Sequence, residues 1–126
     1  MSMTAIPHTN VEHSDWVRSL DFYKDELGIL KGRLTEVAGK NTGDEAAKGA
    51  EHFENQFRIQ ITKIDELRHD INNHLAEIAG QAAASAGHIE KAELDSHAAL
   101  RDRYIAQEKI VNDLRHEFYR YAAKWM

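Results

Sequence analysis

Apolar residues recur along the first third of the chain at alternating steps of four and three. They are Trp16, Leu20, Tyr23, Leu27, Leu30, Leu34 and Val37. This heptad spacing places every member on one face of an α-helix, as in a coiled coil. Residues that can cap a helix precede the run at 9–14, and glycine and asparagine follow it at 39–43. The pattern therefore predicts a helix over residues 13–38.

Two further segments carry the same spacing. One runs through Phe53, Phe57, Gln60, Ile64, Leu67, Ile71, His74 and Ile78, and the other through Leu100, Tyr104, Gln107, Val111, Leu114, Phe118, Tyr121 and Trp125. Thr42 and Glu45 form a capping box ahead of the first, and Gly80 and Gly87 interrupt the apolar face between the two. Helices are therefore expected over residues 44–79 and 86–125.

Three helices joined by short connections predict an all-α fold, an elongated antiparallel three-helix bundle that forms one domain over residues 1–126. At 1.5 Å per residue the first helix spans about 39 Å and the others about 55 Å each. The second and third helices then extend beyond the first, which leaves Ile71, Leu75 and Ile78 between two helices only. An uncovered apolar strip usually marks an interface, so these three residues are expected to join two copies of the chain in a homodimer.

Gly28 and Gly32 form a Gly-x-x-x-Gly pattern inside the first predicted helix. The pattern indicates either a close contact between two helices or a locally weak stretch of helix. The charged residues on both sides of it exclude a membrane dimer.

Two polar residues interrupt the apolar positions of the second and third helices. Folding the hairpin on paper places Gln60 and Gln107 within a turn of each other, near Tyr23 and Tyr104. A buried polar layer of this kind usually fixes register and partner choice in a coiled coil. Changing Gln60 to leucine is expected to raise stability and to loosen oligomeric specificity.

Composition narrows the possible functions. The chain has 126 residues, a net charge of −5 and no cysteine. It therefore has no disulfide, no thiolate nucleophile and no cysteine-ligated metal. Its charge disfavours nucleic-acid binding, since the basic residues of the third helix are interleaved with acidic ones. No serine lies in a strand–turn–helix elbow, which disfavours nucleophilic catalysis, so a protein without enzymatic activity is expected over an enzyme and the question stays open. The chain offers no apolar run of about 20 residues and no leader segment, which predicts a soluble, cytoplasmic protein that does not contact membranes.

Histidine is unusually frequent, with eight in the chain. His13, His74 and His97 fall on core-facing heptad positions, and the hairpin register brings them to one end of the bundle. Three converging imidazoles are able to hold zinc or iron. Buried histidines are more often satisfied by hydrogen bonds alone, so no cofactor is the first expectation and an iron or zinc ion is the alternative.

Hemerythrins share two local spacings with this chain. His97 and Asp102 resemble their His-x4-Asp, and His52 with Gln56 resembles their His-x3-Glu with glutamine replacing the acid. The rest of the hemerythrin pattern is missing, because no His-x3-His occurs and only three helices are predicted. His52 and His97 also lie far apart along the hairpin, which excludes the family as a whole-chain match.

Glu66 with His69, and Asp113 with His116, resemble the Glu-x-x-His of ferritin-like di-iron proteins. In an antiparallel hairpin these two pairs are separated by about 30 Å and both lie on outer faces. They are therefore unable to share a metal pair, and this family too is excluded.

Four short segments resemble a group of small helical proteins from Bacteroidetes-type bacteria. The segments are residues 20–27, 33–37, 51–57 and 64–67. The resemblance implies a soluble bacterial protein and carries no activity, cofactor or catalytic residue.

Taken together, these patterns favour a structural or protein-interaction bundle that associates with itself or with another protein. The alternative is a metal-binding bundle that uses the histidines at one end.

Overall fold

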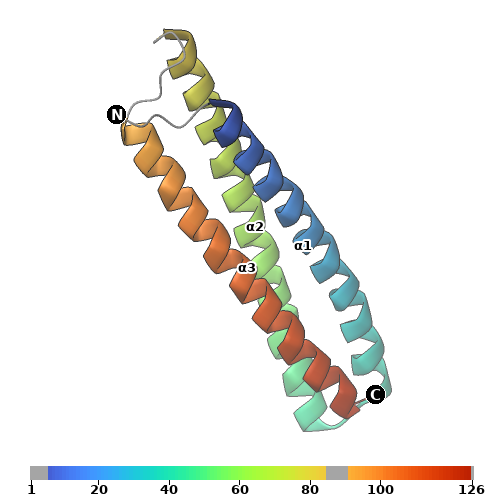
Figure 1. Cartoon of the computed structure of the whole chain (residues 1–126). Coiled ribbons are helices and arrows are strands. Elements are labelled where there is room, and N and C mark those ends of the chain that lie inside the picture. The colour runs from blue at the N-terminus through green and yellow to red at the C-terminus, as the bar shows by residue number, and fades with distance from the viewer. Residues whose placement is uncertain (1–5, 85–90, 126) are drawn as a thin grey trace.

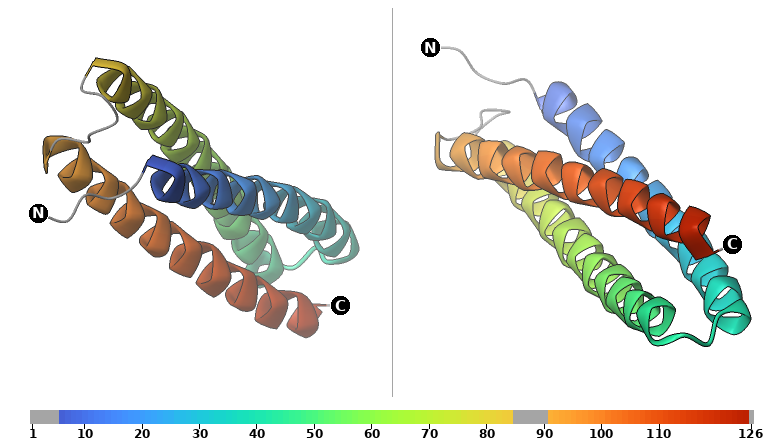
Figure 2. Two further views of the ribbon diagram at one scale, coloured as in Figure 1. Left: turned by 45° about the horizontal axis from the view of Figure 1, so that its top comes forward. Right: turned by 90° about the horizontal axis from the view of Figure 1, so that it is seen from below.

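The computed structural model describes residues 6–84 and 91–125, and these residues form three α-helices (Figure 1). Helix α1 spans Ile6–Lys40, α2 spans Asp44–Ala84 and α3 spans Lys91–Trp125. Helices α1 and α3 start at the same end of the bundle and α2 starts at the opposite end (Figures 1 and 2). The predicted all-α three-helix bundle is confirmed. Within the described residues, no helix combines the length and apolar character needed to cross a bilayer.

Two predicted helix ends are wrong. Helix α1 begins at Ile6 rather than at residue 13. Pro7 is compatible with this start, because the first turn of a helix needs no intrahelical N–H donor. Helix α2 continues past Gly80 to Ala84 rather than ending at residue 79, because the alanines after Gly80 favour helix. The predicted start of the third helix at residue 86 lies outside the described residues.

The observed length of α1 removes the reason for the predicted dimer interface. Helices α1 and α3 each contain 35 residues and α2 contains 41, so the expected mismatch between a short first helix and two long ones is absent from the described chain. Ile71 and Ile78 are 0% and 1% exposed within the single chain, and Leu75 is half-buried. The prediction that Ile71, Leu75 and Ile78 form an uncovered strip is therefore wrong, and the homodimer loses the argument that supported it.

The core follows the three heptad patterns along the length of the bundle. Aromatic side chains fill the end where α2 begins. Phe118 makes edge contacts with Phe53 and Phe57, each with ring centroids 5.4 Å apart, and Phe53 and Phe57 lie 6.0 Å apart. The other buried apolar residues include Trp16, Leu20, Leu27, Leu30, Leu34, Val37, Ile64, Leu67, Ile71, Val111 and Leu114. The aromatic end and the histidine end of the bundle are thus chemically distinct.

A polar layer crosses the middle of the bundle. Gln60 and Gln107 are both 6% exposed, and the Gln107 amide donates to Gln60 Oε1 at 2.7 Å. Tyr23 and Tyr104 instead donate to a common acceptor, Glu108 Oε2, at 2.7 and 3.1 Å. The structure brings the two glutamines together as a pair, while the two tyrosines join α1 to α3 through a carboxylate that the sequence pattern did not single out.

Helices α1 and α3 are also connected by charged pairs along their shared side. Arg101 contacts Glu12 and Arg115 contacts Glu26, with distances of 2.7 and 2.6 Å. Both pairs connect residues 89 apart in the sequence, so they repeat with the heptad along two parallel helices. The pair nearer the histidines takes part in the candidate site.

Candidate metal centre

Each helix contributes one of the three core-facing histidines. His13 comes from α1, His74 from α2 and His97 from α3, and their exposed fractions are 1%, 4% and 4%. One nitrogen from each ring lies within 4.8 Å of the others. The ring centroids are 4.8–6.0 Å apart. The structure thus brings together the three histidines that the sequence placed at one end of the bundle.

His97 is oriented by a carboxylate that is itself fixed by an arginine. Its Nε2 lies 2.8 Å from Glu12 Oε1, and Arg101 contacts both carboxylate oxygens at 2.7 and 3.0 Å. An ionised carboxylate only accepts hydrogen bonds, so the Nε2 of His97 that faces Glu12 carries the hydrogen. The Nδ1 of His97 then keeps its lone pair. His97 Nδ1 therefore points a lone pair toward the other histidines.

Among the residues that the structure describes, carboxylates lie near one nitrogen of the His74 ring. Its Nδ1 lies 3.4 Å from Glu93 Oε2 and 4.0 Å from Glu77 Oε2. Its Nε2, on the far side of the ring, is buried and has no hydrogen-bond partner among the described residues. A buried ring nitrogen without a partner is energetically unfavourable, and metal coordination would satisfy it.

His13 packs between the other two histidines. Its Nε2 lies 2.9 Å from His97 Nδ1, which is hydrogen-bond distance. Its Nδ1 is buried, again with no hydrogen-bond partner in the described part of the chain. The hydrogen bonds of this cluster therefore leave one nitrogen of His13 and one of His74 unsatisfied.

Aromatic rings cover one side of the cluster. Trp16 stacks on His97 with centroids 4.9 Å apart and an interplanar angle of 25°. Tyr104 stacks in turn on Trp16 at 5.8 Å, and Trp16 also contacts His13 at 5.3 Å. These rings exclude water and hold the imidazoles in place.

Burial keeps two of the histidines uncharged. Desolvation, together with repulsion from His97 and His74, lowers the pKa of His13 to about 4. Desolvation also lowers the pKa of His74. The Arg101 guanidinium holds the pKa of Glu12 well down, at about 2, so this carboxylate stays ionised. Neutral imidazoles are the form that binds metal, so protons do not compete for His13 and His74 at neutral pH.

The cluster fits three ligands of a four-coordinate ion. Nitrogens at about 2.0–2.1 Å from a tetrahedral zinc ion lie about 3.3 Å apart. The His13–His97 nitrogen distance of 2.9 Å is slightly shorter than this, and the remaining distances lie within 4.8 Å. Binding one ion on all three nitrogens would therefore require the rings to shift from the positions that they hold here.

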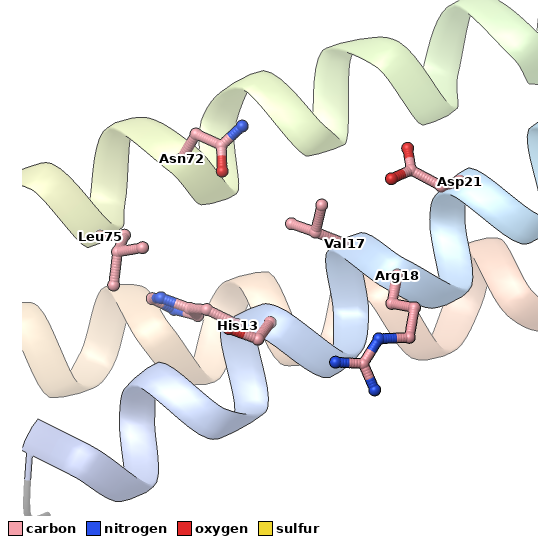
Figure 3. Close-up of a pocket in the computed structure, with 7 residues that line it drawn as sticks. His13, Val17, Arg18, Asp21, Asn72 and Leu75 are labelled. Carbon is pink, nitrogen blue, oxygen red and sulfur yellow. The ribbon is translucent and has the colours of Figure 1, made fainter.

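Surface pockets approach the cluster from two sides. One, of about 360 Å³, lies between α1 and α2 and is bordered by His13, Val17, Asn72 and Leu75 (Figure 3). In Figure 3 the Arg18 side chain points away from α2. The other lies between α2 and α3, where His74 is among the residues that line it. Both give small ions a route to the buried rings.

Sequence reasoning missed the charged residues around the histidines. Glu12, Glu93 and Arg101 occupy positions beside the apolar heptad faces, and only the register between helices shows that they contact the cluster. The sequence does contain a pattern that indicates these ion pairs. Glu12 and Glu26 are two heptads apart, and so are Arg101 and Arg115.

Three histidines that resembled ligands of known iron sites are not among the three buried histidines. His52, His69 and His116 are exposed, and His69 contacts Asn73 at 3.1 Å. Comparisons with protein-family models, curated proteins and solved structures found no match to this chain.

Proposed function

We propose that this protein is a metal-binding helical bundle that holds a divalent transition-metal ion, zinc or iron, on His13, His74 and His97. One observation carries the proposal: three buried imidazoles, one from each helix, place ligand nitrogens within 4.8 Å of one another. Imidazole is a preferred ligand of both metals.

The environment of the histidines supports metal binding over a purely structural role. A structural polar cluster is expected to satisfy its buried nitrogens by hydrogen bonds, yet His74 Nε2, the nitrogen that would bind the ion, has no such partner among the described residues. Glu12 lies 2.8 Å from His97 Nε2, the nitrogen of that ring that faces away from the cluster. Metal-binding histidines usually have such a carboxylate, which fixes the tautomer and raises ligand basicity.

Metal analysis tests this proposal. Protein purified without a histidine tag is expected to contain at least one equivalent of zinc or iron, or to take it up after chelation and dialysis. His74→Ala should abolish that binding, whereas His116→Ala, which changes an exposed histidine, should leave it intact. Absence of stoichiometric metal in the wild-type protein, before and after reloading, would contradict the proposal.

A second candidate function is self-association through the α1–α3 side of the bundle. Phe22 and Ile29 of α1 are 59% and 61% exposed, and Ile105 of α3 is 55% exposed. Phe22 and Ile105 each lie four residues from a member of the α1–α3 ion pairs, Glu26 and Arg101, so they border the same side of the molecule. Exposed apolar residues grouped on one side favour a protein contact, and a second copy of the chain is the partner we propose.

Light scattering tests this second candidate. The wild-type protein should be a dimer at micromolar concentration, and Phe22→Ser with Ile105→Ser should make it monomeric. Ile59→Ser is a matched control, because Ile59 is an exposed apolar residue of α2. A wild-type monomer over the whole concentration range would exclude the interface.

A further inference from the structure

We infer that the centre binds a second metal ion, on Nδ1 of His74 together with Glu77 and Glu93, so that the His74 ring bridges two ions. This inference rests on the proposed metal site, in which the same ring uses Nε2. The two groups of ligands share only His74: one consists of His13, His74 and His97, and the other of His74, Glu77 and Glu93.

The two nitrogens of His74 face different surroundings. Nε2 is buried and unpartnered within the described chain, whereas Nδ1 lies 3.4 and 4.0 Å from the carboxylate oxygens of Glu93 and Glu77. The ring nitrogens of an imidazole point in divergent directions, so ligands gathered at one cannot complete coordination at the other. A single ion on the three histidines therefore leaves the Nδ1 side as a separate set of donors.

The distances at Nδ1 fit coordination better than hydrogen bonding. A charge-assisted bond from an imidazole N–H to a carboxylate is about 2.7–2.9 Å long, which is clearly shorter than the 3.4 Å to Glu93. Two ligands of one tetrahedral ion lie about 3.3 Å apart, close to the observed separation. The Glu77 side chain is 65% exposed, so it is able to rotate and shorten its 4.0 Å distance.

Charge also favours an ion on this side. The three imidazoles bring no negative charge to the first ion, whereas Glu77 and Glu93 together balance the charge of a second divalent ion. Bridging requires Nδ1 to lose its proton, which passes to the solvent as the second ion binds. The imidazolate that results carries a negative charge between the two cations and reduces their repulsion.

The second group of ligands reaches solvent through Glu77, whose side chain is 65% exposed. A surface pocket between α2 and α3 is lined by His74 and Glu77. Asp70 at the same pocket is paired with Arg103 at 2.8 Å, so its carboxylate is already neutralised by a cation. The carboxylates nearest to Nδ1 are therefore Glu93 and Glu77.

Zinc stoichiometry tests the inference. Protein freed of metal is titrated with zinc at pH 8, separated from unbound ion by gel filtration and analysed for metal content. The wild-type protein should retain two equivalents, and the double variant Glu77→Gln with Glu93→Gln should retain one. Glu54→Gln with Glu117→Gln removes two exposed carboxylates elsewhere on α2 and α3 and should retain two. Circular dichroism confirms that each variant is folded.

Each result separates the two proposals. No bound zinc in the wild-type protein would overturn the proposed function itself. One equivalent would support the three-histidine site and overturn the second. Two equivalents in both the wild-type protein and the Glu77→Gln, Glu93→Gln variant would place the additional ion elsewhere and also overturn the inference.

Copper tests whether His74 is the bridge. Two Cu(II) ions joined by one imidazolate couple antiferromagnetically, so the wild-type protein with two bound Cu(II) ions should give a much weaker electron paramagnetic resonance signal than two isolated ions. An undiminished signal from two bound ions would show independent sites and overturn the bridge.

Discussion

At the scale of single residues, the site depends on how each histidine is held. Glu12 is fixed on two sides by Arg101 and contacts His97 Nε2 at 2.8 Å, which directs the lone pair of His97 Nδ1 into the cluster. His74 contacts Glu93 more loosely, at 3.4 Å. The two glutamates therefore have different roles. Glu12 orients His97, whereas Glu93 is a potential metal ligand beside His74.

Glu12→Gln should weaken metal binding while His13, His74 and His97 remain in place. An amide is neutral and stabilises the His97 tautomer less strongly than the carboxylate, so the dissociation constant for zinc is expected to rise about 10- to 100-fold. Competition with a chromogenic chelator measures this constant. Glu54→Gln, at an exposed position of α2, should leave it unchanged, and an equal loss in both variants would contradict the orienting role.

The metal-free protein should lose stability as the pH falls from 6.5 toward 4. Burial lowers the pKa of His13 from 6.5 to about 4, so between these values the unfolded chain holds a proton that the folded chain excludes. The contribution is fully present above pH 6.5, and its loss amounts to about 2 kcal/mol between pH 7.5 and pH 5. Urea unfolding at these two pH values measures it.

His13→Leu should reduce this pH dependence, whereas His116→Ala should preserve it. His116 is an exposed residue of α3 and lies outside the histidine cluster. A pH dependence that is unchanged in His13→Leu would show that His13 is not the group responsible.

The buried glutamine pair should respond differently to single and double substitution. Gln60→Leu alone leaves the Gln107 amide buried without its 2.7 Å acceptor, which is expected to cost about 1–3 kcal/mol. This reverses the gain expected from the sequence, because the structure shows one direct bond rather than a diffuse polar layer. The double change to leucine should recover most of the loss. Thermal unfolding of the three proteins provides the test, and a stabilised single variant would contradict it.

At the scale of helices, the glycines show where α1, α2 and α3 approach closely. A Cβ placed on Gly28 or Gly32 would meet nothing within 4 Å, so the Gly-x-x-x-Gly pattern of α1 is a weak stretch of helix and not a contact. A Cβ on Gly49 would collide with the ring of Tyr121, whose hydroxyl donates to the Ala46 carbonyl at 2.7 Å. Gly49 thus allows α3 to pack closely on the start of α2.

Alanine at these positions should change stability in opposite directions. Gly28→Ala is expected to stabilise the protein by about 1 kcal/mol, since it adds helix propensity without a clash. Gly49→Ala should destabilise it by about 1–3 kcal/mol, because the added methyl group forces Tyr121 to move. Chemical denaturation measures both, and a stable Gly49→Ala variant would show that the ring shifts at little cost.

At the scale of the whole molecule, each end of the bundle has its own chemistry. Aromatic rings close the end where α2 begins, while histidines and their carboxylates occupy the opposite part. Because each of the three histidines belongs to a different helix, a bound ion would link all three where α1 and α3 begin. Metal binding and the packing of this end are therefore expected to stabilise each other.

The sequence alone determined the helices, their apolar faces and the three histidines of the candidate site. Heptad spacing is local, and it follows directly from the periodicity of a helix. The tertiary structure decided which neighbours complete the site, because Glu12, Arg101 and Glu93 reach the histidines only through the register between helices. It also decided that Ile71 and Ile78 are covered, because burial depends on how the helices pack against one another. The contacts between helices also set the orientation of each histidine ring, and therefore which nitrogen faces the cluster. The spacing of residues along one helix carries no information about that orientation.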